Sequence, residues 1–297
     1  MHRSSSVALA AALSALLAGC APTAPPTAST DAGKARFTDD PYPSTYRPIA
    51  ASPVLISGAT VLTGTGQRID NADVLLRDGK VAAIGTGLDA GIEATRVDGR
   101  GKWVTPGLID VHSHLGVYPS PGMSAHSDGN EATAPVTANV WAEHSVWPQD
   151  PGFHAALAGG ITSLQVLPGS ANLVGGRGVT LKNVSATTMQ GMKFPGAPWG
   201  LKMACGENPK RVYGQKSGPS TRMGNVAGYR AAFLEADEYR KKRGKSDADN
   251  GGNGDKKGNG DNGGKRALKL DTLAAAIDGD ILVHIHRYRA DEMAVML

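Results

Sequence analysis

Residues 106–114 read Pro-Gly-Leu-Ile-Asp-Val-His-Ser-His, which combines a turn, a short apolar strand and two histidines. Side chains alternate between the two faces of a strand, so His112 and His114 project to the same side, about 7 Å apart at roughly 3.3 Å per residue. Two imidazoles on one rigid strand can bind one metal ion. The alternative is two histidines on a half-exposed strand, which would require neither the Pro-Gly entry nor the adjacent Asp110.

The composition is that of a globular protein. Of the 297 residues, 40% are hydrophobic and 20% charged, which is enough apolar material for one large domain or two smaller ones. The net charge of +4 is small and scattered along the chain. It argues against a nucleic-acid partner, which would require a clustered basic surface.

The first twenty residues resemble a bacterial secretory signal. Arg3 precedes an apolar segment, Val7 to Leu17, which is shorter than the about 20 residues of a membrane-spanning helix. The run from Leu17 to Cys20, Leu-Ala-Gly-Cys, resembles a lipobox, which implies cleavage before Cys20 and lipid attachment to its thiol. Ordinary signal cleavage nearby and a chance cysteine are the alternatives. The lipobox predicts a protein of the bacterial cell envelope that faces the periplasm or the exterior and contacts the membrane through its lipid anchor alone.

Residues 21–52 are rich in Pro, Thr, Ala and Ser and show no periodicity, which predicts a flexible tether. Once Cys20 is lipidated, Cys205 is the only thiol left, so we expect no internal disulfide.

Residues 53–104 are predicted to form a small all-β module. Asp78-Gly79 is a strong hairpin signal between two β-rich segments, 72–76 and 80–84. Other β-rich segments of the module are 54–56, 59–62, 95–98 and 102–104.

Residues 105–297 alternate apolar strands with helices, which favours a parallel α/β barrel or sheet. A barrel requires eight strands and typically about 250 residues. The five strands predicted here indicate an incomplete, C-terminally truncated barrel, and residues 244–266 form a polar, low-complexity insertion. The predicted strands are 108–114, 161–167, 178–184, 200–204 and 281–286, and the predicted helices are 151–158, 222–243, 268–277 and one from 291 onwards.

The ordered set of motifs resembles the metal-dependent amidohydrolase superfamily, and in particular its imidazolonepropionase-like branch. Residues 104–114 resemble the first-strand signature, and the β-module resembles the N-terminal part of the superfamily's β-sandwich. The resemblance covers roughly residues 53–297. Its other motifs are Asp-Gly-Asn-Glu at 128–131, Leu-Pro-Gly-Ser-Ala-Asn at 167–172, Gly-Gly-Arg-Gly at 175–178, and the segments 202–214 and 286–291.

The resemblance implies a TIM (β/α)8 barrel that holds one or two divalent metal ions, usually zinc. The implied reaction is hydrolysis of a C–N bond in a small-molecule substrate, an amide, cyclic amide or dipeptide-like compound. Neutral imidazoles and carboxylates suit Zn²⁺, and zinc lowers the pKa of a bound water to about 7, which yields hydroxide at neutral pH.

The same resemblance assigns the metal ligands position by position. His112 and His114 match the first-strand ligands, and His286 matches the fifth-strand ligand. The fourth-strand ligand of the superfamily is a carboxylated lysine or a glutamate. Glu207, just past the fourth strand, is preferred because it needs no modification, and Lys202 within that strand is the alternative. The non-functional interpretations are a loop carboxylate for Glu207 and a strand residue with a solvated amine for Lys202.

Four further histidines are not assigned as ligands. His284 shares the strand face of His286 by alternation, so we expect it in the barrel interior. His126, His144 and His154 fall in or near the long segment after the first strand and are expected on the surface or in loops.

The segment Gly175-Gly176-Arg177-Gly178 lacks the Lys-Ser/Thr pair of a phosphate-binding loop. We expect a tight loop leading into the third strand.

No catalytic base is assigned. In the superfamily, a sixth-strand histidine and an eighth-strand aspartate follow, and the counterpart positions would lie beyond Leu297. We therefore expect the chain as written to hydrolyse little. The alternative function is a non-catalytic, metal-binding lipoprotein derived from an amidohydrolase. The sequence does not decide the substrate, the number of metal ions or the oligomeric state.

Overall fold

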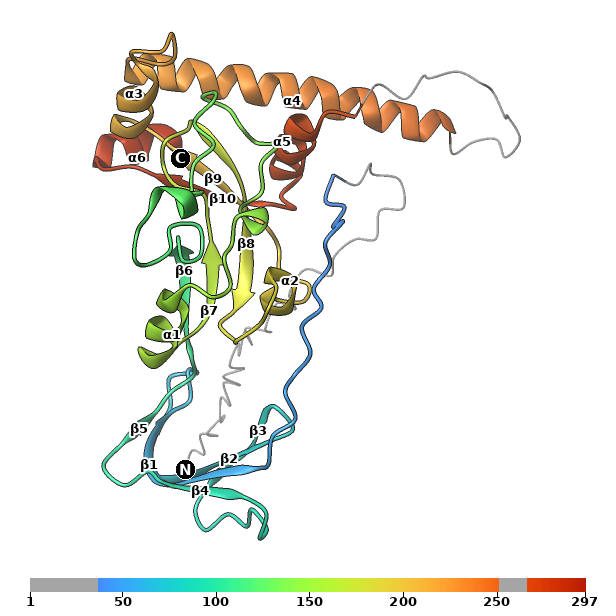
Figure 1. Cartoon of the computed structure of the whole chain (residues 1–297). Helices are drawn as coiled ribbons and strands as arrows, with labels where there is room; N and C mark the ends of the chain where they lie inside the picture. The colour runs from blue at the N-terminus through green and yellow to red at the C-terminus, as the bar shows by residue number, and fades with distance from the viewer. Residues whose placement is uncertain (1–36, 251–265) are drawn as a thin grey trace, which may run out of the picture. The chain divides into compact units, whose positions relative to one another are not determined.

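The computed structural model describes residues 37–250 and 266–297, which form two β-sheets and six α-helices in that part of the chain (Figure 1). The predicted signal segment, Cys20, residues 21–36 of the predicted tether and residues 251–265 of the predicted insertion lie outside the described residues. A search of the described helices found none with the length and apolar character needed to span a membrane.

The first sheet contains the strands β1 to β5 and follows the predicted β-rich segments. Its order is β3-β2-β1-β4, and β5 also pairs with β1. Asp78 and Gly79 both have positive φ, 52° and 70°, as the predicted two-residue hairpin between β2 and β3 requires. The strand bounds are Val54–Leu62 (β1), Arg68–Arg77 (β2), Lys80–Gly85 (β3), Thr95–Asp98 (β4) and Trp103–Val104 (β5).

The second sheet is a curled five-stranded sheet whose strands lie in chain order, β6 to β10. β6 runs parallel to β7 and β9 runs parallel to β10, but β8 is antiparallel to both of its neighbours. The strand bounds are Leu108–Ser113 (β6), Ile161–Val166 (β7), Val174–Lys182 (β8), Gly200–Ala204 (β9) and Leu282–His286 (β10).

The prediction of an all-parallel arrangement is therefore wrong at β8. Residues 167–173 make too short a connection for a crossover between parallel strands, which takes a dozen or more residues, so β7 and β8 form an antiparallel pair. β8 also begins at Val174, so the segment Gly175–Gly178 lies inside the strand and is not the predicted loop.

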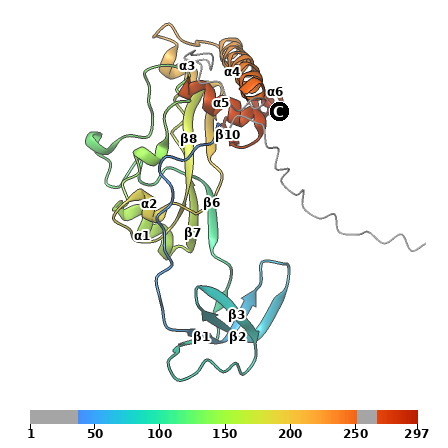
Figure 2. The same ribbon diagram turned by 90° about the vertical axis from the view of Figure 1, so that its right-hand side faces the viewer.

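The four predicted helices correspond to α1, α4, α5 and α6 and match their bounds closely with one exception, whereas α2 and α3 were not predicted. Helix α4 continues to Asn250, seven residues beyond the predicted end at Arg243, so the start of the polar insertion is helical. Figure 2 shows α4 beside α5, where the Tyr239 hydroxyl donates to Asp271. The bounds are Pro151–Ala158 (α1), Met189–Met192 (α2), Glu207–Tyr213 (α3), Arg222–Asn250 (α4), Leu268–Asp278 (α5) and Ala290–Met296 (α6), with 3-10 turns at Ser124–His126 (η1) and Ala142–His144 (η2).

The second sheet has one apolar and one polar face. Leu201 and Met203 of β9 pack in one core cluster with Leu273 of α5, and Leu164 of β7 packs in another with Phe153 of α1. The alternate residues of the same strands project to the opposite, concave face. The polar side chains of that face form the candidate site.

Part of the predicted tether contacts the second half of the chain. The Phe37 carbonyl accepts a hydrogen bond from Arg177 Nη2 at 2.9 Å, and the Phe37 side chain is buried. Lys193 Nζ lies 2.8 Å from Asp40 and 2.7 Å from the buried Glu143. These contacts anchor residues 37–40 of the predicted tether.

Arg177 and Gly176 explain why the Gly-Gly-Arg-Gly motif lies in a strand. The buried Arg177 guanidinium packs against the rings of Trp141 (4.4 Å) and Trp199 (5.2 Å), and its Nε donates to Thr272 at 2.8 Å. Gly176 has φ +114°, and a Cβ there would lie 2.3 Å from the Val140 carbonyl oxygen. The motif therefore makes packing contacts within the fold and does not form a phosphate-binding loop.

Substituting Gly176 by Ala should destabilise the chain by about 3 kcal/mol or more, because both the positive φ and a clash with backbone oppose a side chain. Gly196→Ala is the matched control, since Gly196 also has positive φ (71°) but open space around it, so its cost should stay near about 1–2 kcal/mol. Urea unfolding of both variants measures the difference. Equal losses would contradict the clash.

Candidate metal centre

Imidazole and amine side chains from three strands meet on the concave face of the second sheet. Lys202 of β9 places its Nζ 2.6 Å from His112 Nε2 of β6, although β7 and β8 lie between these strands. The His112 and His114 rings lie 5.2 Å apart. On the other side, His284 of β10 pairs in register with Lys202. The curl of the sheet thus brings its two edge strands toward the same lysine.

Lys202 is buried, with 1% of its surface exposed. Burial lowers the pKa of its amine to about 8, because the charged ammonium loses its hydration. His112 keeps part of its surface exposed, and yet its pKa falls to about 4, first through partial desolvation and then through the positive charge of Lys202. The neighbouring imidazoles contribute smaller effects in the same direction. The His112 ring is therefore neutral at physiological pH.

His114 is oriented by a backbone carbonyl. Its Nδ1 lies 2.8 Å from the Leu167 oxygen, and because a carbonyl can only accept, Nδ1 must carry the proton. This tautomer leaves the Nε2 lone pair free to bind a metal, the arrangement usual for metal-binding histidines. Burial lowers the pKa of His114, and the carbonyl bond opposes that shift only in part.

His284 and His286 carry buried nitrogens without partners. The Nε2 atoms of both rings are buried and make no hydrogen bond to any described residue. Burial, and then the charge of Lys202, lowers the pKa of each ring, so both are neutral at physiological pH. Neutral, unpartnered imidazole nitrogens fit a metal ion such as Zn²⁺.

The two candidates for the fourth-strand ligand lie in different places. Lys202 is in the cluster. Glu207 is the first residue of α3, its side chain is exposed, and it is not among the charged groups that perturb the four histidines. The structure thus brings together His112, His114, Lys202 and His286 but not Glu207.

The cluster is not a finished metal site as it stands. Within residues 37–250 and 266–297, no three His, Cys, Asp or Glu side chains are arranged so that they could hold a metal ion. The Lys202 amine occupies the space next to His112 Nε2 where a metal ion would bind.

The other histidines lie away from the cluster, in agreement with the sequence. The His126 ring packs edge-on against Trp147, the His144 ring stacks on Trp141, and His154 is exposed on α1. Sequence reasoning missed two neighbours of the site. Gln165 of β7 is buried, and the strand alternation that places it on the concave face was readable from the sequence. Tyr118 packs edge-on against His114 at 5.9 Å, which no motif indicated.

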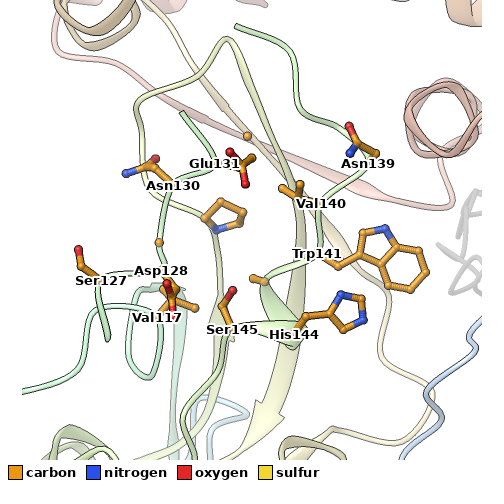
Figure 3. A pocket seen from close by; sticks show the side chains of 14 residues that line it. Val117, Ser127, Asp128, Asn130, Glu131, Asn139, Val140, Trp141, His144 and Ser145 are labelled. Atoms are coloured by element: carbon orange, nitrogen blue, oxygen red, sulfur yellow. The ribbon is translucent and has the colours of Figure 1, made fainter. Parts of the chain in front are cut away.

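A cavity of about 400 Å³ lies next to the cluster. Figure 3 shows Asn130 and Glu131 on one side of it and Trp141 and His144 on the other. Val117 and Pro168 connect it to the cluster, since Val117 N–H donates to the His114 carbonyl and Pro168 follows Leu167, the acceptor of the His114 proton.

Known proteins with similar sequences are hydrolases of C–N bonds. The chain is 31% identical over 245 residues to the amidohydrolase tasK of Hapsidospora irregularis, which covers 76% of this chain and 24% of the relative. It is 28% identical over 138 residues to a dihydroorotase of Trichlorobacter lovleyi, covering 46% of this chain and 27% of that protein. No protein-family model matches the chain.

Among solved structures, the fold is similar to that of an amidohydrolase from Thermotoga maritima MSB8, with a TM-score of 0.70 and 38% identity over 82% of this chain and 60% of that one. Together with the sequence relatives, this similarity supports membership of the amidohydrolase superfamily. The chain spans about a quarter of the length of the two curated relatives and 60% of the solved structure.

Replacing Lys202 by Met should raise the pKa of His112, because the charge that opposes its protonation is removed. The pKa should stay below the usual 6.5, since partial desolvation is the larger cause. NMR titration of the metal-free chain measures the shift. Lys182→Met, which removes a lysine of β8 that does not perturb His112, is the control. A His112 pKa that stays at about 4 in Lys202→Met would contradict this electrostatic picture.

Proposed function

We propose that this chain carries the metal centre of a hydrolase that cleaves a C–N bond in a small amide, cyclic amide or dipeptide-like substrate with a metal-activated water. The observation that carries the proposal is the convergence of three neutral imidazoles, His112, His114 and His286, around the buried Lys202. The similarity to amidohydrolases and a dihydroorotase supports the reaction class. We also propose the imidazolonepropionase-like branch and a complete (β/α)8 barrel for the whole protein, both on the motif resemblance.

The residues present fit a zinc ion better with Lys202 than with Glu207 as the fourth-strand ligand. The three imidazoles are neutral but bring no negative charge to balance a dication. A lysine whose pKa is lowered to about 8 has more neutral amine at physiological pH than an ordinary lysine, and a neutral amine adds to CO₂ to form a carbamate. Carboxylated Lys202 would supply the anionic oxygens that the cluster lacks. A bound zinc ion would lower the pKa of its water and polarise the scissile carbonyl.

The chain's own residues prepare this chemistry by orientation. The Leu167 carbonyl fixes the His114 tautomer, so that Nε2 faces the cluster as an acceptor. Burial keeps the rings unprotonated, which is the form that a metal requires. A non-catalytic metal-binding protein is the second candidate, because these strands offer no second carboxylate that could act as a catalytic base. Asp110 is the one acidic side chain of β6, β9 and β10, and its Oδ1 already accepts the His112 backbone N–H.

Zinc analysis of variants tests the ligand assignment. If Lys202 is the ligand, Lys202→Met and His286→Ala should each lower zinc affinity at least about 10-fold. Glu207→Gln should then bind zinc like the unaltered chain, and His154→Ala, an exposed histidine of α1, is the control. Zinc content by plasma mass spectrometry and a chelator competition measure the effect, with circular dichroism to verify folding. Loss of zinc in Glu207→Gln but not in Lys202→Met would reverse the assignment.

Turnover tests the function itself. The zinc-loaded 297-residue chain should hydrolyse at least one compound of a panel containing L-dihydroorotate, N-acetyl amino acids and dipeptides, but only slowly, because no catalytic base is assigned within it. A chelator should abolish that activity and zinc should restore it, while Lys202→Met should remain inactive. A chain that binds zinc tightly but hydrolyses no member of the panel would favour the non-catalytic alternative.

A further inference from the structure

Tyr118 lies at the edge of the candidate metal centre, where a substrate could reach it. Its backbone N–H donates to the His114 carbonyl at 3.0 Å, and its ring meets the His114 imidazole edge-on with 5.9 Å between centroids. About 38% of the residue is exposed. Burial of the rest of the side chain raises its pKa, so the hydroxyl keeps its proton at neutral pH.

Asn130 fixes the direction of the hydrogen bond at that hydroxyl. Asn130 Oδ1 accepts the backbone N–H of Ala171 at 3.1 Å, and because an N–H can only donate, the amide cannot be turned round. Asn130 Nδ2 must therefore donate to the Tyr118 oxygen. The Tyr118 O–H is left to donate elsewhere, and no described residue accepts it.

Two glycines show that the pair is held in place. Gly169 N–H donates to the Gly129 carbonyl at 2.6 Å, which ties the Asp-Gly-Asn-Glu segment to the loop after β7. A Cβ on Gly129 would lie 2.2 Å from the Tyr118 ring, and a Cβ on Gly169 would lie 2.4 Å from Asn130 Nδ2 and 2.6 Å from the Tyr118 hydroxyl. Neither glycine could carry a side chain without a clash with the Tyr118–Asn130 pair.

The pair connects the metal centre to the wall of the cavity of about 400 Å³. Asn130 and Gly129 line that cavity, and Tyr118 reaches from Asn130 back to His114 (Figure 3 shows Asn130 at the cavity wall). The Tyr118 hydroxyl, which is hydrogen-bonded to a residue of the cavity wall, therefore lies beside the cavity as well as beside His114.

We propose that Tyr118 is a substrate-binding residue whose hydroxyl donates a hydrogen bond to a carboxylate or second carbonyl oxygen of the substrate, with Asn130 as the positioning residue that aims it. This proposal rests on the proposed function and narrows it: the preferred amide carries a second oxygen acceptor near the scissile bond. N-acyl amino acids, dipeptides and cyclic imide-like compounds meet that requirement, and simple alkyl amides do not.

Two substitutions test the proposal from opposite sides. Tyr118→Phe removes the hydroxyl and keeps the ring. Asn130→Asp keeps the hydroxyl but reverses its hydrogen bond, because one carboxylate oxygen still accepts the Ala171 N–H and the other now accepts the Tyr118 O–H. Tyr46→Phe, a half-buried tyrosine beside Lys182, is the matched control. The zinc-loaded full chain is titrated calorimetrically with N-acetylglycine, L-dihydroorotate and N-ethylacetamide, and kcat and KM are measured for those that turn over.

We expect Tyr118→Phe and Asn130→Asp each to weaken binding of N-acetylglycine or L-dihydroorotate about 10-fold, the loss typical of one hydrogen bond to a charged or carbonyl acceptor. Binding of N-ethylacetamide and zinc content should not change. In the Tyr118→Phe background, Asn130→Asp should add no further loss, because the two residues act through one hydroxyl.

The failures are distinguishable. A chain that hydrolyses an N-acyl amino acid equally well with Tyr118→Phe would overturn this inference and leave the proposed function standing. Full activity in Asn130→Asp would overturn the positioning role of the amide. A zinc-loaded wild-type chain that binds and hydrolyses none of the three compounds would overturn both this inference and the reaction class on which it rests.

Discussion

The burial of Lys202 is the constraint on which the candidate site depends. A strand of the second sheet places this amine on the concave face with 1% exposure, where an ammonium ion is poorly solvated. The pKa of the Lys202 amine is therefore lowered to about 8, and its Nζ lies 2.6 Å from His112 Nε2. Burial lowers the pKa of each of the four histidines, and the charge of the same amine lowers it further, so the imidazoles stay unprotonated. A cluster with these properties lacks a negative charge, and a metal with an anionic ligand would supply the balance.

The period-2 alternation of strands accounts for what the sequence could predict. It placed His112 and His114 on one face, and His284 beside His286, because the side-chain direction in a strand depends on position alone. It could not give the direction of β8, which depends on the length of the connection through residues 167–173. Nor could it choose between Lys202 and Glu207. That choice depends on the contact between Lys202 and His112, which are 90 residues apart in the chain and separated by two strands in the sheet.

Pattern reasoning also could not assign the physical role of residues inside the motifs. Arg177 was expected in a tight loop, but its guanidinium packs against the rings of Trp141 and Trp199 and donates to the Phe37 carbonyl. The contact joins three segments that no local pattern connects. The same holds for the Asp-Gly-Asn-Glu segment, since its residues were noticed for their resemblance while their physical role, the placement of Tyr118 by Asn130, required the coordinates of Ala171 and Gly169.

The imidazoles of the candidate centre are held unequally, and this explains why they do not yet form a metal-binding group. Lys202 lies on β9, which is paired on both sides, whereas the histidines lie on β6 and β10, the two edge strands of the sheet. β6 pairs with β7 through an irregular register, and Ile109 and Val111 on its outer face are 68% and 63% exposed. On β10, Leu282 and Val283 are 50% and 45% exposed. An edge strand is fixed by one ladder of hydrogen bonds instead of two, whereas zinc requires Zn–N distances in the narrow range of about 2.0–2.1 Å. A metal ion that binds histidines of both edge strands would fix the positions of β6 and β10 relative to each other and to Lys202.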